Sequence, residues 1–565
     1  MFRENGARYL ALGLLVAIGL YFGLYTGGGV TRYESQCPST KTHRPAAFES
    51  HKHVLDRILH DPDFRNESVT KLQKAIQIRT EVHDDDTELV EDDFEYWSKF
   101  DKFEEYLNST FPLFYSHVTL HKVNYHGLVY IWQGSNQNLK PLLLMAHQDT
   151  VPVSEDSLSQ WEHDPFAGYY DGTNLHGRGI ADCKDQLVGL FESAEELIKT
   201  GFAPKRTIIY SFGFDEEVMG NRNKNAKWIE QQYGADSIYA VVDEGGVNLD
   251  TIEGVKMSVP GTAEKGYVDL KVIIETPGGH SSIPPPHTSI GMMGEMIVAI
   301  ENLDIPTYFT PANPAYWEYV CVAEHSPQIT PKAKKSILNS RFDKASNKDA
   351  RKYIDIDLHK GFVVKSTQAL DIVFGGVKAN ALPEYVELTI NVRIAMEETV
   401  EIVSRRILGA VEPVAEKYGL GLTFRLNGDE KILDPKSQGH CLVNVVSLLE
   451  PAPVTPINDE EWDIFAGTIK HVYEDLVAPN QTLVVAPGIG SGNTDTKWYW
   501  NLTRHIYRYR PGQLPGVYSK EHGVNEFIPV DSHLHLIAFF YEYILSVDEA
   551  EDTTEFSSPL FQIEN

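Results

Sequence analysis

The sequence is poor in cysteine and in positive charge, and both shortages exclude whole classes of protein. Its 565 residues include four cysteines, Cys37, Cys183, Cys321 and Cys441, and no CxxC pair. A zinc knuckle built from cysteines is therefore excluded, although one or two disulfides remain compatible with this number. Lys and Arg total 50 against 80 Asp and Glu, which gives a formal net charge of −30. Such a charge repels phosphate backbones, so we expect no nucleic-acid partner.

Internal repeats, low-complexity tracts and long hydrophobic runs are also lacking, with one exception. Residues 9–26, YLALGLLVAIGLYFGLYT, carry no charge and follow a short tail, 1–8, that contains Arg3 and Arg8. This length is typical of a signal peptide or of a membrane span. Because no small-x-small cleavage site follows, we predict a retained signal-anchor that holds the protein to the membrane. Residues 27–50 are rich in Gly, Thr, Ser and Pro, which is typical of a stalk.

The remaining chain is expected to lie in a lumen, as the body of a single-pass type II membrane protein. N-x-S/T sequons, which mark acceptor sites for glycosylation in such compartments, begin at Asn66, Asn108, Asn480 and Asn501. The sequence therefore predicts a lumenal glycoprotein.

Two kinds of apolar pattern predict two kinds of sheet. Continuous apolar runs indicate strands buried on both faces, and they occupy 142–146, 207–214, 239–242 and 482–486. Apolar residues at i, i+3, i+4 spacing predict a helix over 185–201, between the first two runs. Strict alternation, typical of a half-exposed sheet, occurs in 268–274 and 386–394, with helical patterns at 288–303 and 397–412 to cover it. Pro413 is expected to end or kink the second of these helices.

These patterns predict an α/β fold with a second, smaller domain inserted into it. The catalytic domain, a mixed sheet flanked by helices, would comprise 51–260 and 431–547. The inserted lid domain, of α+β type, would comprise 261–430. An acidic tail, 548–565, is expected to be a flexible surface segment.

Acidic residues and a histidine follow the buried strands, where an open α/β sheet binds its ligands. His147-Gln-Asp149, Asp215-Glu216-Glu217 and Asp243-Glu244 each come directly after an apolar run, and Asp182 begins the helix. Each motif alone has an ordinary structural explanation, since an aspartate can cap a helix and paired glutamates can be solvated. Together, however, the carboxylates would repel one another at one edge. One or two divalent metal ions would remove that conflict.

Four motifs in order, HQDTVP (147–152), GRGIADCKD (177–185), DEEVMG (215–220) and DEGG (243–246), resemble a known family. It is the family of dinuclear zinc peptidases that includes glutamate carboxypeptidases, aminoacylases and succinyl-diaminopimelate desuccinylase. Within it, the sequence is most similar to the carboxypeptidases S (Gly-Xaa carboxypeptidases) of fungal vacuoles, which also carry an N-terminal signal-anchor. The resemblance implies two zinc ions per subunit.

It also implies a set of metal ligands. The residues at the ligand positions of the family motifs are His147, Asp182, Asp243, Glu217 and His522. Asp182 would bridge the two ions, with His147 and Asp243 on the first ion and Glu217 and His522 on the second. His505, His533 and His535 compete with His522 for the last position. Cys183 is not a ligand in this reading, because the family does not use the residue beside the bridging aspartate.

The catalytic roles follow from the same resemblance. Glu216 would act as the general base that takes a proton from water and gives it to the leaving amine. Asp149 would orient the imidazole of His147. In the inserted domain, TPGGHSSIPP (276–285) implies that His280 stabilises the tetrahedral oxyanion.

Substrate binding is implied for Asn380, in GGVKANALPE, and for Arg393, in NVRI, which would bind the substrate carboxylate. A glycine-rich segment, 488–497, resembles the loop beside that carboxylate. The segment 304–370 is longer than in smaller relatives, where the lid forms a dimer. This difference leaves the formation of a homodimer open.

The sequence thus predicts a zinc-dependent carboxypeptidase that releases C-terminal amino acids from short peptides, anchored in a vacuole or released there by processing. An N-acyl-amino-acid hydrolase remains an alternative, because its substrate presents the same amide and the same carboxylate. A non-catalytic receptor with a peptidase fold is a third reading. The complete ligand set together with Glu216 argues against it.

Overall fold

The computed structural model describes residues 35–38, 40–84, 86, 89–218, 220–356, 361–434, 438–512 and 520–552. The chain divides into two units, 1–36 and 37–565, and only the second is described below. The predicted signal-anchor, 9–26, lies outside the described residues. Among the helices that are described, none combines the length and the apolar character needed to cross a membrane.

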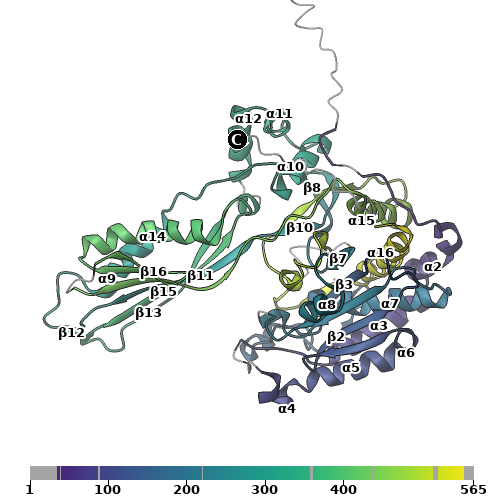
Figure 1. Ribbon diagram of the computed structural model, residues 1–565, viewed down its shortest axis with the longest axis horizontal. Helices are drawn as coiled ribbons and strands as arrows, with labels where there is room; N and C mark the ends of the chain where they lie inside the picture. The colour runs from purple at the N-terminus through teal and green to yellow at the C-terminus, as the bar shows by residue number, and fades with distance from the viewer. Residues whose placement is uncertain are drawn as a thin grey trace, which may run out of the picture. The chain divides into compact units, whose positions relative to one another are not determined.

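Among the described residues, the largest sheet has eight strands in the order β1-β2-β6-β3-β7-β21-β10-β20 (Figure 1). The strands are β1 Thr119–Val123, β2 Gly127–Trp132, β6 Ile208–Gly213, β3 Leu142–His147, β7 Ala240–Asp243, β21 Ile506–Arg508, β10 Gly261–Glu264 and β20 Gly488–Gly490. β3 runs parallel to both β6 and β7, whereas β2 is antiparallel to β6. This mixed sheet flanked by helices confirms the predicted α/β class.

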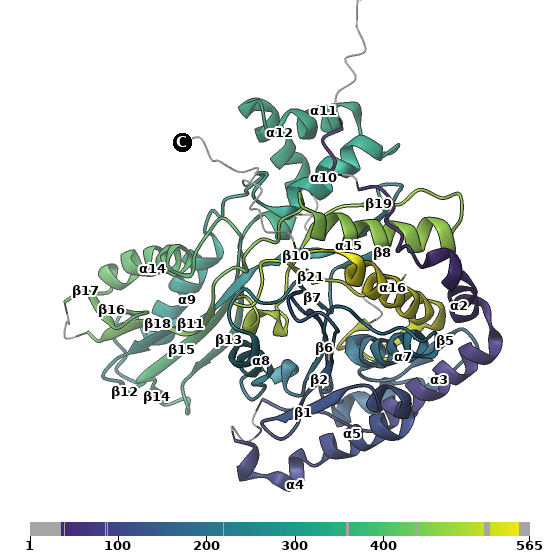
Figure 2. The same ribbon diagram turned by 45° about the vertical axis from the view of Figure 1, so that its right-hand side comes forward.

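Both faces of the sheet are buried, as the continuous apolar runs predicted. In β3, Leu142 and Leu144 face a core shared with helices on one side, while Leu143 and Met145 face a second core on the other. The first face is covered by α2 Phe48–His60, α3 Pro62–Gln77, α7 Asp185–Lys199, α15 Glu460–His471 and α16 Val530–Glu549. The second face is covered by α8 Asn225–Tyr233. Figure 2 shows α16 beside α15 and α7 on the first face.

One apolar run was placed in the wrong sheet. The run 482–486 forms β19 (Val484–Val485), which pairs with β9 (Val255–Val259) in a separate small sheet that also contains β8 (Val247–Ile252). Its residues are buried on both sides, as predicted, because Leu483 and Val484 pack into different cores. An apolar pattern reports burial but does not identify the partner strand.

The inserted part is built on a sheet of six strands within the described part of the chain, in the order β13-β15-β11-β18-β16-β17. They are β13 Thr367–Gly375, β15 Tyr385–Ile394, β11 Gly266–Glu275, β18 His440–Leu449, β16 Gly421–Arg425 and β17 Asp429–Leu433. Alternate residues of β11 and β15 are buried beneath α9 (Ser289–Glu301) and α14 (Val400–Lys417), as predicted. Since β18 lies beside β11, a lid domain defined by its sheet would end near Leu449 rather than at residue 430.

Of the two effects expected of Pro413, an end or a kink, the structure excludes the end of the helix. α14 continues to Lys417 with Pro413 inside it. Val411 and Ala415, on either side, are buried against the sheet, while Pro413 itself is exposed. Packing of the buried face therefore outweighs the lost backbone hydrogen bond.

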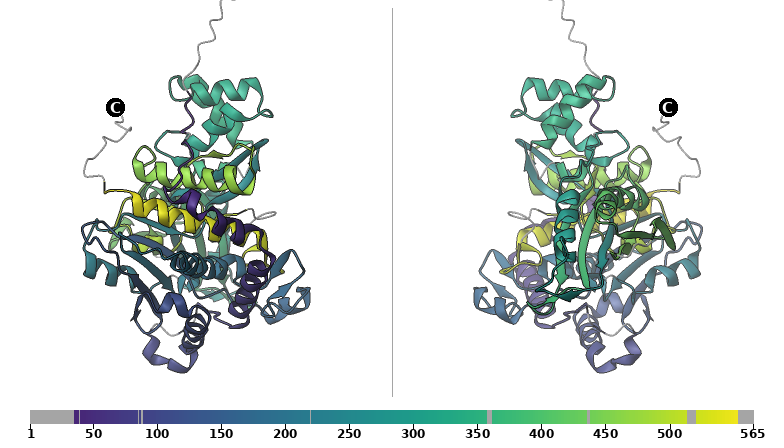
Figure 3. Two further views of the ribbon diagram at one scale, coloured as in Figure 1. Left: turned by 90° about the vertical axis from the view of Figure 1, so that its right-hand side faces the viewer. Right: turned by 90° about the vertical axis from the view of Figure 1, so that its left-hand side faces the viewer.

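The long segment between the lid strands contains a group of helices of its own. They are α10 Pro314–His325, α11 Pro331–Asn339 and α12 Lys344–Asp355. These helices share one apolar cluster and form a compact group (Figures 2 and 3). A disulfide joins Cys321 of α10 to Cys37, while Cys183 and Cys441 are free and buried.

The predicted stalk and the predicted acidic tail both include residues that pack against the rest of the protein. In the predicted stalk, the His43 N–H donates to the Gly467 carbonyl, and Phe48 is buried in α2. At the other end, Asp548 belongs to α16, is buried, and accepts hydrogen bonds from the backbone of Arg206. The expected flexible surface segment is therefore packed at its beginning.

Candidate functional site

Three neighbouring parallel strands deliver the predicted motifs to one edge of the sheet. The order β6-β3-β7 places the carboxyl ends of these strands side by side. His147 is the last residue of β3, the Asp215–Glu217 segment follows β6, and Asp243 is the last residue of β7. The prediction that these segments meet at one edge is confirmed.

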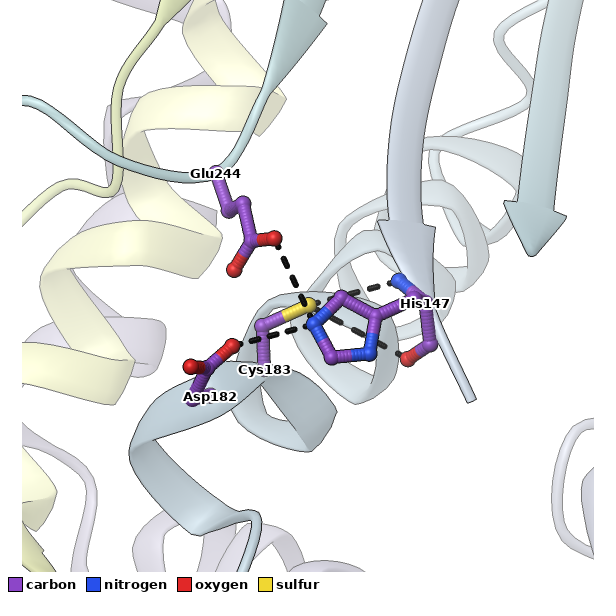
Figure 4. Close-up of side chains that lie close together, drawn as sticks. All are labelled: His147, Asp182, Cys183 and Glu244. Atoms are coloured by element: carbon purple, nitrogen blue, oxygen red, sulfur yellow. Dashed lines mark hydrogen bonds and ion pairs between the residues drawn. The ribbon is translucent and has the colours of Figure 1, made fainter. Parts of the chain in front are cut away.

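His147 is almost fully buried and faces two carboxylates (Figure 4). Its Nε2 lies 3.0 Å from Asp182 Oδ1 and 3.3 Å from Glu244 Oε1. Its Nδ1 lies 3.0 Å from the backbone oxygen of Asp149 and 3.4 Å from Asp149 Oδ1. Because a carbonyl oxygen only accepts, Nδ1 carries a proton and the ring is held with Nε2 toward the acids.

A second group lies on the other side of Asp182. His522 Nε2 is 2.9 Å from Asp182 Oδ2 and 3.0 Å from Glu217 Oε2. One oxygen of Asp182 thus faces His147 and the other faces His522. Of the four candidate histidines, the structure brings His522 to the cluster.

The other three histidines have separate surroundings. His533 Nε2 lies 2.9 Å from Glu192 Oε2 inside the core, and His505 Nε2 lies 3.0 Å from Asp459 Oδ2. His535 is in α16, where burial lowers the pKa of its imidazole to about 4. None of these contacts involves the cluster.

At the DEGG segment the structure places the residue after the predicted Asp243 beside His147. Glu244, rather than Asp243, reaches His147. Asp243 still belongs to β7, where its backbone oxygen accepts from the Tyr509 N–H and its Oδ2 is buried without a hydrogen-bond partner among the described residues. Successive side chains at a strand end point to opposite sides, so the two acids cannot occupy one position. The longer side chain of Glu244 spans the distance to the imidazole.

The three acids of the 215–217 segment have three different surroundings. Asp215 accepts hydrogen bonds from the backbone N–H groups of Arg222 (2.6 Å) and Asn223 (3.0 Å), which closes the loop after β6. The Glu217 N–H donates to Asp149 Oδ2 over 3.0 Å, so Asp149 contacts both His147 and Glu217. Glu216 lines the same cavity as the cluster.

Burial and mutual repulsion perturb the carboxyl groups at this edge. Burial first, and then Asp182, raise the pKa of Glu217 to about 7. Burial and nearby carboxylates also raise the pKa of Glu216 and of Glu244 well above the usual range. The imidazole of His522 donates hydrogen bonds to Asp182 and Glu217, which raises its pKa to about 10. These shifts show that the carboxylates of the cluster repel one another, and a bound cation would offset that repulsion.

These residues fit two divalent metal ions that share Asp182. Imidazole nitrogens and carboxylate oxygens are the donors that zinc accepts in such sites. The ligand atoms of His147, Asp182 and Glu244 lie within 4.8 Å of one another, as do those of Asp182, Glu217 and His522. Glu217 Oε1 is buried and has no hydrogen-bond partner among the described residues. A metal ion would supply the partner that a buried carboxylate oxygen needs.

Sequence reasoning missed the residues that hold the Asp182 loop. Glu526 is fully buried and accepts from the N–H groups of Gly179 (3.1 Å) and Ala181 (2.8 Å) and from Arg178 (2.6 Å). Arg510 pairs with Asp185 at 2.9 Å on the helix side of the loop. The only signal for Glu526 was its position four residues after His522.

The lid residues divide into two groups. The Nη1 of Arg393 lies 3.3 Å from Asn493 Oδ1, in the glycine-rich segment that lines the cavity. His280, by contrast, is exposed in β12 (Gly279–His280), at the end of the lid sheet away from β10 (Figure 1). Asn380 is exposed beside it, and its backbone oxygen accepts from the Ser281 N–H. Neither His280 nor Asn380 contacts the cluster.

The chain is similar in sequence to known peptidases and hydrolases. A family model described as peptidase family M20/M25/M40 matches residues 143–546. Carboxypeptidase S of Saccharomyces cerevisiae is 43% identical over 506 residues, covering 88% of this chain and 87% of that protein. An N-fatty-acyl-amino acid synthase/hydrolase of Bos taurus is 30% identical over 465 residues, covering 80% of this chain and 83% of that protein.

Solved structures share the fold at low identity. A dipeptidase of Saccharomyces cerevisiae superposes with a TM-score of 0.57 at 14% identity, covering 89% of this chain and 99% of that chain. An M20 family metallo-carboxypeptidase of Sulfolobus solfataricus has a TM-score of 0.56 at 14% identity, with 85% and 99% covered.

Proposed function

This chain belongs to peptidase family M20/M25/M40, whose members are metal-dependent peptidases, and we propose that it is a dinuclear zinc carboxypeptidase acting on short peptides. One observation carries the proposal: the two oxygens of Asp182 face two separate groups of ligand atoms. The resemblance to carboxypeptidase S supports release of the C-terminal amino acid. The acyl-amino-acid hydrolase of Bos taurus supports the alternative of N-acyl amino acid substrates.

The proposed ligands are assigned from these contacts. His147, Asp182 and Glu244 would hold one ion, and Asp182, Glu217 and His522 would hold the other. Bound here, two zinc ions would polarise the scissile carbonyl and lower the pKa of the attacking water.

The chain itself moves the protons. Glu216, which lines the same cavity, takes a proton from the attacking water and gives it to the leaving amine. Asp149 keeps the His147 ring and the Glu217 backbone in place. Arg393 and Asn493 bind the carboxylate of the substrate, for which a guanidinium offers paired donors.

We also propose that the lid forms a homodimer, which the position of His280 supports. Because the Ser282 N–H donates to His280 Nδ1 over 3.1 Å, the proton lies on Nε2, which can donate to an oxyanion. His280 does not contact the cluster of its own chain, so this role would require the cluster of a second copy. β13 is an edge strand that exposes Ile372, Val373 and Phe374 by 60%, 63% and 57%. An exposed apolar edge is a template for pairing with a second copy. Sedimentation of the purified protein at several concentrations decides this, and a monomer throughout would refute it.

A vacuolar lumen with an N-terminal anchor is the proposed location. The Cys37–Cys321 disulfide is typical of an oxidising compartment, and all four sequon asparagines are exposed. Endoglycosidase treatment of the protein from its own cell would show a mobility shift, and alkaline extraction of membranes would test the anchor.

A substrate panel separates the two candidate activities. We expect N-blocked Gly-Leu to be hydrolysed faster than an N-fatty-acyl amino acid, and both activities to disappear with a chelator and return with zinc. Exclusive hydrolysis of the acyl amino acid would assign the chain to the deacylases. Inactivity on both, with metal bound, would refute the enzymatic proposal.

Metal binding is expected to release protons at pH 7. Without metal, His522 has a pKa of about 10 and is protonated at this pH, whereas a ligating imidazole must be neutral. The apparent affinity should therefore rise as the pH is raised toward that pKa.

Calorimetric titration with zinc in two buffers of different ionisation enthalpy measures the number of protons. In a His522→Ala variant it should fall by about one, because that group no longer contributes. A matched His505→Ala variant, outside the cluster, should keep the wild-type value. Equal release in all three proteins would contradict the assignment of His522.

A further inference from the structure

The cavity that contains the metal-binding cluster extends along helix α10. It has a volume of about 540 Å³ and is lined both by Asp182, Glu217 and His522 and by residues of the helical insertion. The insertion contributes an apolar wall made of Tyr319, Val322, Ile329, Tyr353, Phe362 and Val363. Most of these side chains belong to one cluster with α11 and α12. The insertion therefore shapes the space next to the reacting groups.

One carboxyl group interrupts this wall. Glu318 lies on α10 next to Tyr319 and one turn before Val322, and all three line the cavity. Glu318 makes no hydrogen bond or ion pair with any other residue that the structure describes. Burial alone raises its pKa to about 7, and no charged neighbour contributes to that shift. A carboxyl group in such surroundings costs free energy unless something pairs with it.

No structural role accounts for Glu318. The N-terminus of α10 is capped by Asn313, whose side chain accepts from the Ala315 N–H. Glu318 lies beyond the first turn, where a carboxylate no longer benefits from the helix dipole. A residue that serves neither the helix nor the core, and whose side chain borders the substrate cavity, is available to a ligand.

We propose that Glu318 binds an aliphatic ammonium group of the substrate, either the amino terminus of a short peptide or a lysine side chain. The aromatic rings of Tyr319, Tyr353 and Phe362 line the same cavity, and aromatic faces attract cations. An ammonium donor paired with a carboxylate forms a charge-assisted hydrogen bond. This inference rests on the proposed peptidase function and names its substrate class: unblocked or lysine-containing peptides. A fatty-acyl chain would leave Glu318 without a partner.

The test measures binding rather than turnover. In a Glu216→Gln background, which is designed to prevent hydrolysis, calorimetry gives the affinity for Gly-Leu, Gly-Gly-Leu and Gly-Gly-Gly-Leu, free and N-acetylated, and for N-acetyl-Lys-Leu. Adding Glu318→Gln keeps the shape of the side chain and removes its charge. We expect at least one ammonium-bearing ligand to bind about 10- to 100-fold more weakly, and the acetylated glycyl peptides to change by less than about twofold.

The affected ligand identifies the source of the ammonium group. A loss confined to the free glycyl series assigns the amino terminus and its length, and a loss confined to N-acetyl-Lys-Leu assigns a lysine side chain. Glu324→Gln, on the same helix but away from the cavity, should change neither.

Three results would overturn the proposal: equal weakening of free and acetylated peptides, no weakening of any ligand, or failure of every peptide to bind. Wild-type hydrolysis without dependence on Glu318 would leave the proposed function intact and remove this inference. Binding that depends on Glu318, without any hydrolysis by the wild type, would do the reverse. Failure of every peptide to bind would refute both.

Discussion

Replacement of Glu216 by Gln is expected to lower kcat for peptide hydrolysis by about 10²- to 10⁴-fold, the range that positioned general acid–base groups contribute. The amide cannot take a proton from water or return it to the leaving amine. Among the described residues, Glu216 forms no hydrogen bond or ion pair with His147 or His522, which pair with Asp182 instead, so we expect the variant to retain its metal. Steady-state kinetics together with metal analysis of the same sample measures both quantities.

Glu217→Gln is the matched control, since it changes the adjacent residue in the same way. Glu217 Oε2 lies 3.0 Å from His522 Nε2, and its loss should remove about one metal ion per chain along with activity. If Glu216→Gln loses metal and Glu217→Gln does not, the roles of the two neighbours are reversed. Retention of full activity by Glu216→Gln would refute its role as the base.

Glu244→Ala is expected to lower both metal content and activity, the latter at least about 100-fold, because one ion contributes several kcal/mol to stabilising the transition state. Asp243→Asn should have a much smaller effect on metal content. The structure puts Glu244 Oε1 at 3.3 Å from His147 Nε2, while the Asp243 side chain forms no hydrogen bond or ion pair with that imidazole among the described residues.

The comparison of these two variants tests whether Glu244, rather than Asp243, is the metal ligand. Metal analysis by mass spectrometry and thermal unfolding with and without added zinc should both separate them, because a ligand that binds only the folded state raises its stability. Burial raises the pKa of Asp243 to about 7, so Asn replaces a carboxyl group whose charged form the surroundings already disfavour. Loss of metal from Asp243→Asn alone would restore the assignment made from the sequence.

The family and the fold class were predictable because their signals are local. Apolar runs that end in His147 and in the 215–217 acids reveal both the buried strands and the edge where they meet. The family match confirms the resemblance carried by those motifs. The buried faces of the lid strands were equally predictable from the sequence, because the alternation of apolar and polar residues is a local pattern.

The remaining details depend on geometry that a motif does not contain. DEGG offers two adjacent acids, and only the direction of each side chain at the end of β7 distinguishes Glu244 from Asp243. Helix α14 continues past Pro413 because the packing of its buried face outweighs the helix-breaking tendency of proline. The remote position of His280 and the isolation of Glu318 were likewise invisible, because each depends on where distant segments lie in the folded chain.

The disulfide between Cys37 and Cys321 makes the covalent connectivity of the chain differ from its linear order. The two cysteines are 284 residues apart, and the ring they close contains His147, Asp182, Glu217 and Glu244 but not His522. A protease that cuts before Cys37 would separate the predicted anchor from the body. A cut between Cys37 and α2 would not, because the upstream fragment would remain attached through helix α10, the wall of the substrate cavity. Release of the enzyme by that second route requires reduction as well as proteolysis.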